Sequence, residues 1–189
     1  MPTSMSRIAL LSGTILASGF AVSALAAPVV IQNNYVQAGV SDYGTLGSDG
    51  GTPPGILFDP TGTSNYGNND FLTPGDPFEG FYISATNPAA PAGGAVSWAS
   101  NNDGSRGSDF GLVAPTSVTA TSATWTATST DGGVTVTNDY SLTTLSGRSV
   151  IAITTTLTAN EDLTGIDFLR TLDPDPDVNN FGSYFTNNT

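Results

Sequence analysis

Alternation of apolar and polar residues dominates the second half of the chain. Apolar residues of one parity run through residues 134–142, and another such set runs through residues 151–157, each interleaved with Thr or Ser. Successive side chains of a strand point to opposite faces, so this alternation predicts half-buried antiparallel strands. The turn-forming residues 131–133 and 146–148 separate these runs and predict hairpins.

In the segment before these strands, the apolar residues switch from even-numbered to odd-numbered positions. Val118 and Ala120 share one parity, whereas the alternating apolar residues of 123–127 have the other. One continuous strand cannot present both sets to the same core. We therefore expect a bulge or a break near Thr121–Ser122.

The first half of the mature chain consists of short apolar bursts joined by segments dense in Gly, Asn, Asp and Pro. The bursts predict short strands at 29–31, 55–58, 78–84 and 95–99. We divide the chain into a signal peptide (1–26), a loop-rich β region (27–111) and an antiparallel β region (112–189), both β regions belonging to one fold. Helix periodicity is nearly absent after residue 27. The pattern predicts an all-β fold, an antiparallel β-sandwich with long loops. The alternative is a β-helix-like passenger, although no fixed-period repeat supports it.

Residues 1–26 have the features of a secretory signal peptide. Arg7 precedes an apolar run at residues 8–22, and Ala24-Leu25-Ala26 matches the small-residue cleavage rule. The apolar run is shorter than the ~20 residues that span a bilayer, and no other segment could span one. We expect cleavage after Ala26 and a secreted, extracellular or cell-surface product. Residues 181–189 resemble a turn leading into another strand, which predicts a longer native product that could continue into an anchor.

Charge and composition exclude several functions. The chain has 16 acidic residues against 4 basic ones, a net charge of −12, with no cysteine and no histidine. All four basic residues are arginines. The charge disfavours nucleic acid and anionic membranes. Serine–histidine and lysine catalysis, thiolate chemistry, disulfides and histidine-ligated zinc are also excluded within this chain.

The sharpest local motif is a run of oxygen-bearing residues at alternate positions. It comprises Asp173, Asp175, Asp177 and Asn179. Calcium prefers six to eight oxygen ligands, which such a run can supply in part. We therefore name these four residues as a candidate Ca²⁺ site. The alternative is a solvated acidic turn that ends a strand at 166–172, with Arg170 neutralising part of the charge.

The remaining acids and aromatics carry weaker signals. Glu79 lies among aromatic residues and could be a raised-pKa general acid of a glycosidase, but we expect an ordinary strand with an outward carboxylate. The acids of the loop-rich half, which include Asp42, Asp59 and Asp70, are expected to be solvated. The aromatic residues that could stack on sugar rings are Trp98, Trp125, Tyr66 and Tyr82. We expect the two tryptophans to lie in the core, and we assign no catalytic or cofactor-binding residue.

Two stretches resemble large bacterial surface proteins. Residues 154–160, Phe168, Arg170 and the acidic run 173–177 are similar to a recurrent strand-turn-DPDxD segment of autotransporter-type passengers and of extracellular proteins with C-terminal sorting tails. Residues 59–62 and 78–81 are similar to the N-terminal part of the same group. The resemblance implies a secreted or surface-attached β protein with no assigned catalysis.

Together these features predict a non-catalytic extracellular or cell-surface β-sandwich module, calcium-stabilised if the acidic run binds the ion, of an adhesin-like surface protein. Its ligand would be a surface glycan or a protein. The alternative function is a carbohydrate-binding module or a fragment of a two-carboxylate glycoside hydrolase.

Overall fold

A computed structural model describes residues 29–47, 54–68, 70–72, 78–91, 94–102 and 107–174. In these ranges the chain forms nine strands and no helix, which confirms the all-β prediction. The strands are β1 (Val29–Gln32), β2 (Val36–Val40), β3 (Ile56–Phe58), β4 (Phe78–Thr86), β5 (Ala95–Asn101), β6 (Ser122–Thr128), β7 (Val134–Leu145), β8 (Arg148–Ala159) and β9 (Thr164–Asp173). No described segment is a helix with the length and hydropathy required to cross a membrane. The signal peptide predicted at 1–26 and the C-terminal residues 175–189 lie outside the described residues.

The strands form three small sheets, each of three strands. Their orders are β1-β2-β3, β5-β4-β9 and β6-β7-β8. Every strand pair in the described ranges is antiparallel, so this part of the chain is not a parallel β-helix. The second sheet combines strands from both predicted regions, because β9 pairs with β4 from Phe78 to Thr86.

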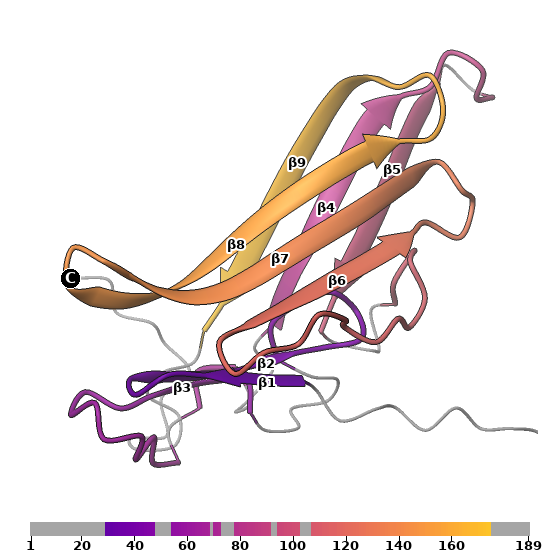
Figure 1. Cartoon of the computed structure of the whole chain (residues 1–189). Coiled ribbons are helices and arrows are strands. Elements are labelled where there is room, and N and C mark those ends of the chain that lie inside the picture. Colours follow the sequence, from indigo (N-terminus) through magenta and orange to yellow (C-terminus); the bar gives the residue numbers. More distant parts are fainter. Residues whose placement is uncertain are drawn as a thin grey trace, which may run out of the picture.

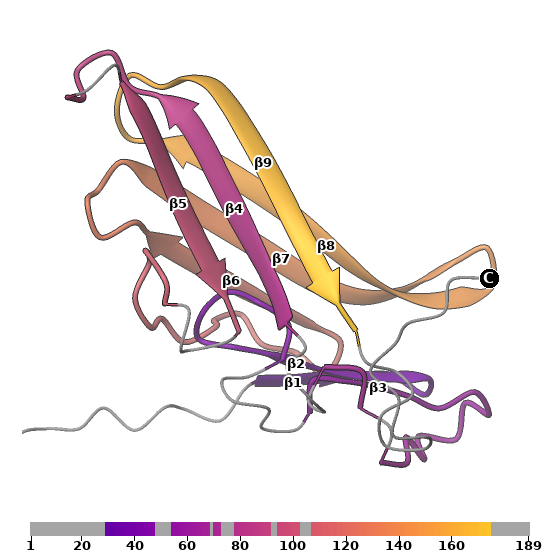
Figure 2. The ribbon, with the colours of Figure 1, turned by 180° about the vertical axis from the view of Figure 1, so that it is seen from behind.

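Two of the sheets lie face to face, with strands running in similar directions (Figures 1 and 2). The β1-β2-β3 sheet crosses one end of this pair. Phe81 of β4 contacts Trp125 of β6 at 6.1 Å between ring centroids, and both rings contact Phe110. The aromatic cluster fills the space between the sheets and is buried.

The segment that links β5 to β6 closes one side of the two facing sheets. Asp109 exchanges hydrogen bonds with Ala99 of β5, its N–H donating to the Ala99 carbonyl and its carboxylate accepting from the Ala99 N–H. Farther along, Thr116 forms an isolated bridge to Thr124 of β6. Both edges on this side are therefore partly covered by the chain itself.

The β6–β7–β8 meander confirms two predictions made from the pattern. Strand β6 begins at Ser122, so the chain does break at the position where the apolar parity changes. The two residues of the β7–β8 turn, Ser146 and Gly147, have φ of 50° and 78°. Positive φ at both central positions is the feature of a type I′ turn, which matches the twist of the flanking strands.

The loop Ser41–Gly47 after β2 inserts at one end of the two facing sheets. Gly44 has φ of 70°, and a β-carbon there would lie 2.3 Å from the Trp125 ring, so only glycine fits this close approach. The Gly44 carbonyl accepts hydrogen bonds from the Asn138 side chain and the Tyr140 hydroxyl, both on β7. Neither this loop nor the short strand β2 that leads into it was predicted from the sequence.

Candidate functional site

The predicted cation-binding segment reaches the described residues only at its first acid. Asp173 is the exposed last residue of β9. Asp175, Asp177 and Asn179 lie outside the described residues. Where the structure describes the chain, no three acidic side chains lie together closely enough to hold a metal ion. The calcium prediction therefore depends on the spacing in the sequence.

Glu79 is buried, so the expectation of an outward carboxylate was wrong. The residue is 1% exposed, and its side chain lies on the same face of β4 as Phe81 and Ile83. Arg170 on the neighbouring strand β9 makes this burial tolerable, because its Nε donates to Glu79 Oε1 at 2.5 Å and its Nη2 donates to Oε2 at 3.0 Å. In the described residues Arg170 therefore neutralises Glu79.

Glu79, Arg170 and Tyr140 form a polar bridge inside the apolar core. Arg170 Nη2 also donates to the Tyr140 hydroxyl at 2.9 Å, and the Leu46 N–H donates to Glu79 Oε2 at 2.6 Å. Burial raises the pKa of the Glu79 carboxyl, an effect that the Arg170 charge opposes, and burial also raises the pKa of the Tyr140 hydroxyl. The bridge connects β4, β7, β9 and the inserted loop 41–47. Every Glu79 oxygen thus has a donor from the chain, which disfavours a role as general acid.

Asp59 is also buried, contrary to the expectation of a solvated loop acid. It is 1% exposed. Its carboxylate accepts hydrogen bonds from the N–H groups of Thr61, Thr63 and Asn65 at 2.7–3.0 Å and from both threonine hydroxyls. These bonds, above all that from the Thr61 hydroxyl, hold the pKa of the Asp59 carboxyl well below its usual range. The Asp59–Asn65 loop is therefore organised around one carboxylate.

The aromatic residues considered as sugar-stacking groups differ in their exposure to solvent. Trp125 and Trp98 are 0% and 3% exposed, which confirms that both belong to the core. The Trp98 indole N–H donates to the Asp131 carboxylate, and the Tyr66 hydroxyl donates to the Asn33 carbonyl. Tyr82 is 45% exposed and lies between two shallow hollows on the outer face of the β5-β4-β9 sheet.

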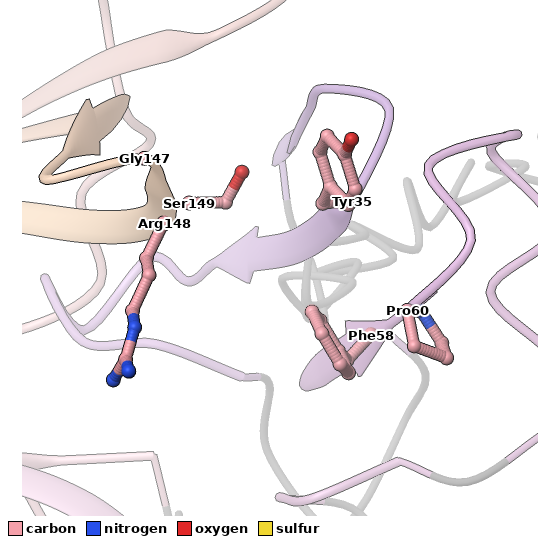
Figure 3. A pocket seen from close by; sticks show the side chains of 6 residues that line it. All are labelled: Tyr35, Phe58, Pro60, Gly147, Arg148 and Ser149. Carbon is pink, nitrogen blue, oxygen red and sulfur yellow. The ribbon is translucent and has the colours of Figure 1, made fainter.

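An open pocket of about 340 Å³ lies between the β1-β2-β3 sheet and the tip of the β7–β8 hairpin. Figure 3 shows Tyr35, Phe58 and Pro60 on one side and the start of β8 on the other. The lining residues are Tyr35, Phe58, Pro60, Gly147, Arg148 and Ser149. Tyr35 and Phe58 are 44% and 46% exposed, so their rings are available to a ligand.

The walls of this pocket are held in place by local structure. The Asp59 loop fixes Pro60, and Gly62 of the same loop lies against the Tyr35 ring. A β-carbon on Gly62 would lie 2.5 Å from that ring, and the residue has φ of 69°. Opposite them, the type I′ turn places Arg148 at the first position of β8. These contacts order the Tyr35 and Pro60 wall of the pocket, and an ordered wall lowers the entropic cost of binding.

The described lining has side chains that suit ligand binding. Two exposed rings can stack on a sugar or another flat apolar face, while the guanidinium and a serine hydroxyl can hydrogen-bond to oxygen atoms. The lining residues that belong to the described ranges include no carboxylate. No local sequence pattern predicts this pocket, because its two walls come from segments far apart in the chain.

No protein-family model, curated protein or solved structure matches the chain significantly. Function is therefore inferred from the sequence and from the geometry of the described residues.

Proposed function

We propose that the chain is a non-catalytic extracellular or cell-surface module of an adhesin-like surface protein, and that its two facing sheets make a β-sandwich. The export signal at residues 1–26 supports the location. The acidic, cysteine-free composition fits a bacterial surface protein. Within this module, the open pocket at Tyr35 and Phe58 is the proposed ligand site.

The main support for a non-catalytic function is the hydrogen bonding of the buried carboxylates. Among the described residues, the buried carboxylates are those of Asp59, Asp70 and Glu79. Asp70 accepts hydrogen bonds from the N–H groups of Gly55, Ile56 and Leu72, as Asp59 does from its own loop. Each of these carboxylates is saturated by donors from the chain, so it organises the fold and has little capacity left for proton transfer.

Export and processing provide the first test. We expect the product purified from outside the cytoplasm of an expressing bacterium to begin at Ala27, as read by N-terminal sequencing. An Arg7→Glu variant should reduce export, because it removes the positive charge that precedes the apolar run. An unprocessed chain in the cytosol would contradict the proposed location.

Calcium stabilisation is tested by thermal unfolding with excess Ca²⁺ or with EDTA. We expect Ca²⁺ to raise the midpoint by several degrees, because an ion that binds the native state alone stabilises it by mass action. In an Asp175→Asn, Asp177→Asn variant the shift should disappear. Asp167→Asn is the matched control, since it removes an acid from β9 outside the acidic run. Equal unfolding midpoints with Ca²⁺ and with EDTA would contradict calcium stabilisation.

A carbohydrate-binding module is the second candidate, and the exposed rings of Tyr35 and Phe58 beside Arg148 favour it. A glycan array with the wild-type protein and a Tyr35→Ala, Phe58→Ala variant tests this. We expect the variant to lose at least tenfold in affinity for any glycan that binds, since each stacked ring contributes roughly 1 kcal/mol. Tyr82→Ala is the matched control on the other exposed surface. If Tyr82→Ala abolishes binding and the double variant does not, the outer face of β4 is the site instead.

A further inference from the structure

Strand β8 is an edge strand whose outer side has no partner among the described residues. It is 12 residues long, and its register with β7 runs from one end to the other without a shift. Residues 149–159 contain no charged residue, no proline and no glycine. Edge strands of soluble proteins usually carry such features because they block pairing with another strand. The free edge of β8 is therefore well suited to accept a strand.

The apolar interior is open along the same side of the molecule. Figures 1 and 2 show β8 and β9 at the same side of the two facing sheets. On the inner face of β9, Ile166, Phe168 and Leu172 are 43%, 38% and 50% exposed. The inner residues of β8, which include Ile151 and Leu157, are only partly buried. A strand added to β8 would cover these side chains as well as the free backbone groups.

The charges of the chain indicate which strand fits. With a net charge of −12, two copies of this chain repel each other over most of their surfaces. Residues 149–159 are an uncharged strip, and this lets a second copy approach. The edge of β9 is less suitable for self-pairing, because it carries Asp167 and Asp173.

Strand β8 is paired with β7, a strand that presents similar residue types to it. Opposite it on β7, Thr137 faces Thr156 and Thr135 faces Thr158, while Leu142 faces Ile151. Cross-strand pairs of threonine and of branched apolar residues stabilise sheets. A second β8 in antiparallel orientation offers the same residue types.

We propose that β8 is a dimerisation strand, which pairs antiparallel with β8 of a second copy across a two-fold axis. The pairing joins the two β6-β7-β8 sheets into one continuous sheet. It also brings the open interiors together, so that the exposed inner residues of β9 become buried. Strand pairing alone covers a modest area, and these apolar residues supply the additional contact that a stable dimer requires.

Sedimentation equilibrium of the whole exported chain tests the proposal. We expect a dimer at micromolar concentration. A Thr154→Lys, Thr156→Lys variant should weaken it roughly tenfold or more, because like charges then face each other near the axis. Thr126→Lys, Thr128→Lys is the matched control, with the same change in net charge on the exposed face of β6. A monomeric wild type, larger polymers, or equal weakening by both variants would overturn the proposal.

Single cysteines give a second measurement that does not depend on weakening the dimer. The chain has no cysteine, so Ala152→Cys, Thr154→Cys and Thr156→Cys each introduce one thiol on the outer face of β8. Directly opposed residues in an antiparallel pair lie about 4.5–5.5 Å apart, within reach of a disulfide. We expect mild oxidation to link copies at the position nearest the axis and not at Thr126→Cys on β6. Linkage at no β8 position would contradict the antiparallel β8 pairing and therefore the dimer.

Discussion

The two sides of the facing sheets differ in how completely they are closed. On the β5–β6 side, the linking segment 107–121 covers both edges, and Trp125 and Phe110 are almost fully buried. On the β8–β9 side no described segment covers the edges, and Phe168 remains 38% exposed although it stacks on Phe81. Strands with the same alternating pattern therefore have fully buried apolar residues on one side and partly exposed ones on the other.

This difference shows that alternation determines which face of a strand is apolar but not how deeply that face is buried. Strand β7 lies in the middle of its sheet, and its inner residues from Val134 to Leu142 are 0–8% exposed. Strand β8 has the same alternation but lies at the edge, so its inner residues stay half-buried. The burial of a strand depends on the other segments that cover it. The alternation of apolar residues within the strand carries no information about those segments.

The largest expected effect separates the two sides directly. Trp125→Ala should lower the free energy of unfolding by about 3–5 kcal/mol, because it leaves a cavity in the closed core. Phe168→Ala on the open side should cost about 1 kcal/mol, since the ring is already partly hydrated and solvent can fill the space it leaves. Denaturant unfolding of both variants, at a protein concentration low enough for the wild type to be monomeric, measures the difference. Equal losses would mean that the open side is covered within the monomer.

The polar bridge should show the next largest effect. Glu79→Gln should lower the free energy of unfolding by about 3 kcal/mol, because it leaves the Arg170 charge buried without its counter-ion. The combined Glu79→Leu, Arg170→Met variant should regain most of this loss, since both charges are then replaced by apolar groups. Denaturant unfolding at pH 7 tests both variants. If the combined variant is as unstable as Glu79→Gln, the hydrogen bonds to Leu46 and Tyr140 matter more than the ion pair.

The smallest effect concerns the Asp59 loop and depends on pH. The folded-state pKa of Asp59 lies below its unfolded value of about 3.9, so the ionised form stabilises the fold above that pH. This contribution is lost as the pH falls below 4. Asp59→Asn should therefore have a lower melting midpoint than the wild type at pH 7, and the difference between the two midpoints should shrink progressively as the pH falls from 4 toward 2. A constant difference across this range would exclude the carboxylate charge as the cause.

The candidate sites were harder to predict than the strands, because most depend on contacts between distant residues. The burial of Glu79 follows from Arg170, which lies 91 residues away in the chain. Local signals did exist in one case. Thr61 and Thr63, two and four residues after Asp59, are typical of a loop that folds onto a carboxylate. The prediction of a solvated Asp59 did not take these two threonines into account.

The amino-acid sequence by itself determined the all-β class, the faces of β7 and β8, the break before β6 and the positions of the hairpin turns. These features depend on side-chain alternation and on the conformational preferences of a few adjacent residues. Only the tertiary structure decided that loop 41–47 inserts beside Trp125, that Glu79 is buried and that Tyr35 and Arg148 line one pocket. Such features require segments far apart in the chain to meet, and the free energy of those contacts is not contained in any local pattern.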